Sequence, residues 1–170
     1  IHHASAGVRE QALAAAESRL EKNASWLERL LPLANDPDPR VRFQTALTLG
    51  VSGDGRVVDA VARIALRDGA DRWTRAAVFS AVAGRERDLF QALLASAGTD
   101  SKAGGGDVWS ELGRLLGASQ PPDAWPAVVA QIVAPPHAPD RATFARPFAL
   151  LSGLGEAVRS RGGGGEEGVL

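Results

Sequence analysis

The sequence contains no cysteine, no methionine and no tyrosine among its 170 residues. Without cysteine the chain cannot form a disulfide, a thiolate-bound metal site, an iron–sulfur cluster or a covalent link to a c-type haem. The cysteine count does not separate the cytosol from the periplasm, so it leaves the compartment open.

Long apolar runs and an excess of one charge are also missing. No stretch approaches the ~20 apolar residues of a membrane-spanning helix, and no signal-like segment opens the chain. With 19 basic and 20 acidic side chains, the formal net charge is -1. The chain therefore has no overall positive field that would attract nucleic acid or an anionic membrane.

Aromatic residues make up only 5% of the chain, whereas the 45% hydrophobic content comes mainly from alanine, leucine and valine. This composition suits closely packed helices better than a β-sandwich. Apolar residues recur at helical spacing, as in 26–31 and 57–65. The pattern predicts helices over about 7–20, 24–34, 39–50, 55–67, 71–83, 86–97, 107–117, 123–133 and 142–159.

Helix start and stop signals agree with these ranges. Asp38-Pro39 places an N-cap before a proline at the first helical position, and Asp71 and Asp107 precede later helices. Glycine is expected to end three helices, at Gly50, Gly84 and Gly117. Because the links are short, consecutive helices should pack antiparallel as hairpins.

Similar segments begin at Val8, Val41, Arg72 and Val108, at intervals of 33, 31 and 36 residues. One helix pair fills each interval, and small residues in its second helix let neighbouring helices approach closely. These small residues are Ala12, Ala46, Ala76, Ala77 and Gly113. The repeat predicts a right-handed α-solenoid over 1–160, beginning inside a truncated repeat, and a flexible glycine-rich tail or linker over 161–170.

The stretch from Asp36 to Gly50 resembles the HEAT-repeat pattern, with an acidic-proline turn, a Val-Arg pair, small residues and a closing Leu-Gly. The resemblance implies antiparallel helix pairs in a HEAT-like, armadillo-type superhelix. The predicted fold class is accordingly all-α, with about nine helices.

The residues that acid–base or nucleophilic catalysis needs are few and isolated. The only histidines are His2, His3 and His137, and no serine lies in a Gly-x-Ser-x-Gly turn. The glycine runs lack the spacing of phosphate-binding loops. We therefore predict no catalytic, cofactor-binding or metal-binding residue in this segment, which is not expected to be an enzyme.

Arg9, Arg42 and Arg75 lie at comparable levels of successive second helices, and Arg72 lies close to Arg75. They have two interpretations: a ladder of bonds between repeats, with turn carboxylates such as Asp36 or Asp38 as partners, or an interaction face. The ladder is favoured. Core packing is likewise favoured over base or ligand stacking for the tryptophans, Trp26, Trp73, Trp109 and Trp125.

The order of four segments, at 6–13, 36–50, 71–81 and 150–154, resembles the helical-repeat region of planctomycete-type membrane-bound dehydrogenases. In such proteins a glucose/sorbosone dehydrogenase-like β-propeller is joined to HEAT repeats and a c-type cytochrome domain. The resemblance implies a bacterial, periplasmic or exported parent protein. This chain lacks the Cys-x-x-Cys-His motif and a propeller pattern, so no redox residue carries over.

The leading hypothesis is a non-catalytic scaffold or protein-interaction module, bound to a protein partner or to neighbouring domains of the same chain. One alternative is a nucleic-acid-directed module similar to HEAT-like DNA glycosylases, with Arg72, Trp73 and Arg75 near Asp71 as the residues involved. Another is a partner-binding scaffold unrelated to dehydrogenases.

Overall fold

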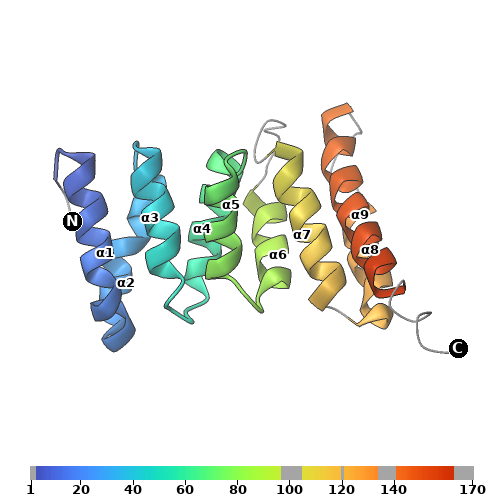
Figure 1. The fold of residues 1–170 in the computed structure, drawn as a ribbon, viewed down its shortest axis with the longest axis horizontal. Coiled ribbons are helices and arrows are strands. Elements are labelled where there is room, and N and C mark those ends of the chain that lie inside the picture. The colour runs from blue at the N-terminus through green and yellow to red at the C-terminus, as the bar shows by residue number, and fades with distance from the viewer. Residues whose placement is uncertain (1–2, 97–104, 120, 134–140, 163–170) are drawn as a thin grey trace, which may run out of the picture. The chain divides into compact units, whose positions relative to one another are not determined.

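The computed structural model describes residues 3–96, 105–119, 121–133 and 141–162. Within these ranges the chain forms nine α-helices, three 3₁₀ turns and no strand (Figure 1). The all-α prediction is confirmed. The chain divides into two compact units, Ile1–Gly104 and Gly105–Leu170, and the predicted single repeat domain over 1–160 stays a prediction.

The first unit contains six helices in the order that the sequence predicts. They are α1 (Ala6–Lys22), α2 (Leu27–Leu30), α3 (Pro39–Leu49), α4 (Arg56–Asp68), α5 (Arg72–Ala81) and α6 (Glu86–Ser96). Except for α2, each begins and ends within two residues of its predicted bounds. Helical spacing of apolar residues was therefore sufficient to locate them.

The predicted helix over 24–34 is wrong in detail. Only the single α-helical turn α2 forms there, between 3₁₀ turns at Ala24–Trp26 and Leu31–Asn35. Pro32 lies at the start of the second 3₁₀ turn. Because proline has no backbone N–H to donate to the carbonyl four residues earlier, it favours ending the α-helical pattern at this point.

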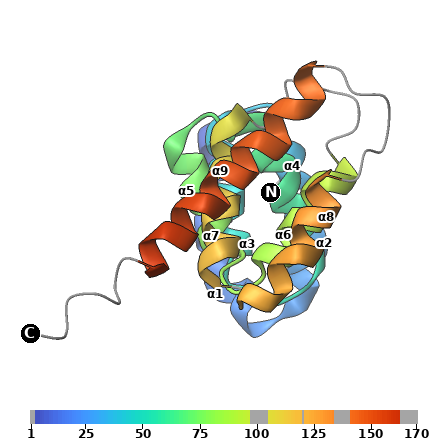
Figure 2. The ribbon, with the colours of Figure 1, turned by 90° about the vertical axis from the view of Figure 1, so that its right-hand side faces the viewer.

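Within the first unit, alternate helices form two layers (Figures 1 and 2). Helices α1, α3 and α5 lie side by side in one layer, and α2, α4 and α6 form the other. The apolar faces of both layers meet in a fully buried core that includes Leu13, Leu27, Leu30, Val41, Leu49, Val57, Val61, Ile64, Leu89 and Leu93. Burial of these side chains is the main force that holds the layers together.

Two predicted N-caps are formed. The Asp38 carboxylate accepts a hydrogen bond from the Arg40 N–H at 2.9 Å, and Pro39 occupies the first helical position of α3. The Asp71 carboxylate accepts bonds from the Thr74 N–H and hydroxyl at 2.7 and 2.9 Å. These bonds favour the ionised form of Asp71 and lower its pKa.

The second unit consists of α7 (Gly105–Ser119), a 3₁₀ turn (Pro122–Ala124), α8 (Trp125–Val133) and α9 (Arg141–Gly162). Asp107, predicted to precede its helix, lies inside α7. Of the predicted tail, residues 161–162 belong to α9, and 163–170 lie outside the described residues. None of the described helices has the length and hydropathy of a bilayer-spanning segment.

Helices α7 and α9 pack backbone against backbone because glycines line their contact. A Cβ atom added to Gly113 would lie 2.1 Å from the Leu150 carbonyl oxygen, and one added to Gly153 would lie 1.8 Å from that of Ser110. Gly117, predicted to end its helix, instead lies within α7 and faces Ala157. Glycine at these positions permits close helix approach rather than helix termination.

We predict that Gly153→Ala destabilises the second unit by about 1–3 kcal/mol or more, because the new methyl group forces the α7 and α9 backbones apart. Gly155→Ala is the matched control: it lies in the same helix with nothing within 4 Å of an added Cβ. That control should gain about 0.5–1 kcal/mol from helix propensity. Amide hydrogen exchange of α7 and α9 measures both effects, and equal protection in the two variants would contradict the prediction.

Candidate functional site

Arg9, Arg42 and Arg75 occupy the same position in α1, α3 and α5. Each directs its Nη1 group to two backbone carbonyls, five and six residues earlier in the preceding turn. The acceptors are His3 and Ala4 for Arg9, Asp36 and Pro37 for Arg42, and Gly69 and Ala70 for Arg75, at 2.6–2.9 Å. The three arginines are therefore equivalent, at a constant interval of 33 residues.

This equivalence corrects the interval of 31 residues proposed between the segments at Val41 and Arg72. That alignment places Trp73 opposite Arg42. The hydrogen bonds instead place Arg75 there, so that Trp73 corresponds to Arg40. Local similarity of the Arg-Trp and Val-Arg pairs had hidden the constant repeat length.

The second edge of two of these guanidinium groups bonds a carboxylate of a following turn. Arg9 donates from Nε and Nη2 to both oxygens of Asp36, each at 2.7 Å. Arg42 makes the same bidentate pair with Asp68, each bond at 2.6 Å. The first pair links α1 to the turn before α3, and the second links α3 to the last residue of α4.

The carboxylate of Asp36 belongs to two local structures at once. It accepts the bidentate bonds of Arg9 and a 2.9 Å bond from the Asp38 N–H, while the side chain is buried. The hydrogen bond from Arg9, followed by the bond from the Asp38 backbone, lowers the pKa of Asp36. Asp38, the other carboxylate considered for the ladder, caps α3 instead.

Arg72 lies apart from these bonds. Its guanidinium group stacks over the ring of Trp73, 4.6 Å from the centroid, and Trp73 is 61% exposed. Core packing is therefore the wrong prediction for Trp73, although Trp109 is only 1% exposed. Trp26 and Trp125 are partly exposed.

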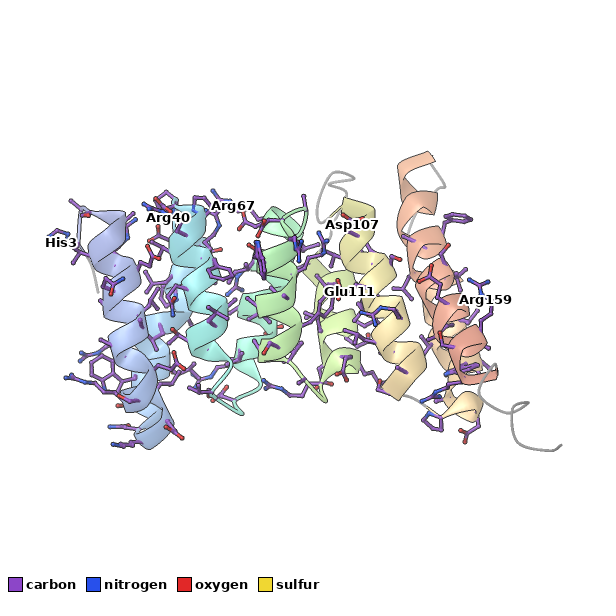
Figure 3. All side chains as sticks on the ribbon, viewed as in Figure 1. His3, Arg40, Arg67, Asp107, Glu111 and Arg159 are labelled. Carbon is purple, nitrogen blue, oxygen red and sulfur yellow. The ribbon has the colours of Figure 1, made fainter. Side chains whose placement is uncertain are left out.

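Exposed residues at equivalent positions of α3 and α5 form a strip, here named the α3–α5 face. It comprises Arg40, Phe43, Leu47 and Val51, and then Trp73, Ala76 and Ser80. Residues three or four apart lie on the same side of a helix, and α3 packs beside α5. Figure 3 shows Arg40 at the N-terminal end of α3. The face is mostly apolar, with a cation at that end and no carboxylate.

The described residues offer little for chemistry. No group of three potential metal ligands is found among them. His3 accepts a 3.0 Å hydrogen bond from the Ser5 N–H at its Nδ1 atom, and the other two histidines, His2 and His137, lie outside the described residues. The geometry thus directs attention to binding surfaces.

Residues 1–83 match the protein-family model described as HEAT repeats. No curated protein and no solved structure matches the chain. The match supports a HEAT-repeat region and includes both bidentate pairs. Together with the helical structure, it gives the all-α, HEAT-like fold that the sequence predicts.

We predict that Arg42→Lys lowers the free energy of unfolding by roughly 2–4 kcal/mol, because lysine cannot bond Asp68 and two carbonyls from one rigid plane. Arg40→Lys, in the same helix, should change it little since Arg40 is 67% exposed. Urea denaturation followed by circular dichroism tests both. A neutral Arg42→Lys variant would contradict the prediction.

We further predict that the cost of Asp36→Asn depends on pH. Since the folded-state pKa of Asp36 is lowered, its ionised form stabilises the fold above its unfolded pKa of about 4, and this contribution is lost as pH falls through the folded pKa. The stability difference from the unchanged chain should therefore be largest near pH 7 and shrink in acid. Asp59→Asn, at an exposed site of α4, serves as a control whose difference stays small throughout. A pH-independent cost of Asp36→Asn would contradict this account.

Proposed function

We propose that this chain is a non-catalytic helical-repeat scaffold that presents the α3–α5 face to a protein partner or to a neighbouring domain. The observation that supports this most is an exposed, mainly apolar strip on a layer whose helices are bridged by bidentate arginine–carboxylate pairs. A surface of this kind excludes water on binding without first having to be ordered. Rigid presentation of side chains, and not chemistry, is its role.

In this proposal Arg9 and Arg42 act as the ladder between repeats. Arg42 is 4% exposed and Asp36 is 7% exposed. Buried charges of this kind stabilise a particular geometry only when their hydrogen-bonding groups are satisfied, as they are here by carboxylates and carbonyls. The ladder fixes the register of the helix pairs, and the partner contacts the opposite, outward side chains.

The same bonds argue against a nucleic-acid partner. The guanidinium groups of Arg9 and Arg42 are directed to carboxylates and carbonyls of the chain itself, so they are not offered to phosphates. Asp71, the carboxylate of the glycosylase-like alternative, accepts the bonds that begin α5. Only the exposed Arg72–Trp73 stack favours that alternative, because aromatic and guanidinium planes can stack on bases.

We also propose that the parent protein is of the dehydrogenase–cytochrome type, in which this segment would space or dock the redox domains in an exported protein. The proposal rests on the order of the four sequence segments that resemble such proteins. Sequencing the gene on both sides of the segment tests it. A propeller before it and a Cys-x-x-Cys-His motif after it would support this setting, whereas unrelated domains would leave only the scaffold.

We predict that a photo-crosslinking residue placed at Leu47 or Trp73 captures one partner protein or domain in cells that produce the natural protein. Both side chains are exposed on the α3–α5 face. The matched control is Arg63, an exposed position of α4 in the other layer, which should capture nothing specific. Equal capture from both layers would contradict the assignment of the face.

The nucleic-acid alternative is tested by fluorescence anisotropy with duplex and single-stranded DNA at low and high salt. No saturable binding is expected. Binding that weakens steeply with salt and is lost in Trp73→Ala would replace the protein-partner proposal, because counterion release and base stacking would then dominate.

A further inference from the structure

Helix α9 carries a second exposed apolar strip, on the side that does not contact α7. Phe148 is 74% exposed, Leu151 36% and Val158 37%, and an added Cβ atom on Gly155 would have nothing within 4 Å. We name these four residues the α9 strip. Their separations of three, four and three residues place them on one side of the helix. Figure 3 shows the neighbouring Arg159 directed away from α7.

The opposite side of α9 is already occupied. Leu150, Leu154 and Ala157 are buried, and Gly153 contacts the α7 backbone. The α9 strip is therefore additional to the core of its unit. Exposed positions of α1 are mostly small, polar or charged by contrast, such as Gln11, Ala15, Ser18 and Lys22. Large apolar side chains gathered on one helix side mark an interaction surface.

We propose that the α9 strip binds the α9 strip of a second copy of this chain, in antiparallel orientation. The spacing reads the same in both directions, so a two-fold axis beside residue 153 superimposes the strip on itself. Phe148 then faces Val158 of the other copy, and Leu151 faces Gly155. A two-fold interface needs such self-complementarity.

The residue sizes favour the antiparallel arrangement over a parallel one. Antiparallel pairing places each Leu151 side chain over a glycine, where the absence of Cβ leaves room for it. Parallel pairing would place Gly155 opposite Gly155 and leave a gap, while Phe148 would face Phe148. Interfaces pack as densely as protein interiors, so the alternation of large and small residues selects the antiparallel register.

The strip is short, which limits the strength of this contact. From Phe148 to Val158 the helix rises by about 15 Å, and one such helix pair buries less than the ~1,600 Å² typical of stable interfaces. The expected dimer is consequently weak and forms in proportion to concentration. In a longer protein it would bring two copies together only when they are locally concentrated.

The test uses the natural absence of cysteine. Phe148→Cys and Val158→Cys are made separately in the full chain, mixed and oxidised under mild conditions. A disulfide between the two different variants is expected, since their Cα atoms face each other across the interface. Each variant alone should cross-link poorly, because its two cysteines would be about 15 Å apart along the helices. Ser18→Cys on α1 measures random collision.

Sedimentation velocity over a range of concentrations gives the second readout. The unchanged chain and Ser152→Asp are expected to dimerise reversibly, whereas Leu151→Asp is expected to stay monomeric with an unaltered circular dichroism spectrum. A monomer at several hundred micromolar would overturn the proposal and indicate that another helix covers the strip. Preferential Phe148→Cys self-linking would overturn the antiparallel register.

Discussion

The guanidinium group of Arg42 holds together parts of the chain that would otherwise be independent. It bonds the carbonyls of the turn before its own helix and the carboxylate at the end of α4. Because the five donors of arginine lie in one rigid plane, satisfying two edges at once fixes both distance and angle. The alignment of α3 with its neighbours, and hence the outward direction of Arg40 and Phe43, depends on that plane.

The sequence predicted what depends on local periodicity and missed what depends on remote partners. The helices and the caps at Asp38 and Asp71 follow from spacing and side-chain chemistry within a few residues. Asp68 was not foreseen as the partner of Arg42, because the two are 26 residues apart and only packing of α3 on α4 brings them together. Gly117 was misread for the same reason: the helix that it accommodates, α9, comes much later in the chain.

The two units bring helices together by different means. In the first, charged side chains bridge helices across a turn; in the second, the α7 and α9 backbones touch through Gly113, Gly117 and Gly153. Each helical glycine costs about 1 kcal/mol in helix propensity relative to alanine. Such a cost is tolerated only when close contact returns more, through many short-range dispersion contacts. The glycines are thus specific to that helix pair.

Positions that point inward repeat chemically, and positions that point outward do not. At the interval of 33 residues, Arg9, Arg42 and Arg75 are identical and make the same carbonyl bonds, whereas the outward set changes from Gly7 to Arg40 to Trp73. The repeat that identifies the fold therefore carries little information about the partner. The residues that break the repeat determine the chemistry of the surface, and on α3 and α5 they are apolar or aromatic with a cation at one end. Near-neutral net charge agrees with this division, because Asp36 and Asp68 balance the inward arginines within the scaffold.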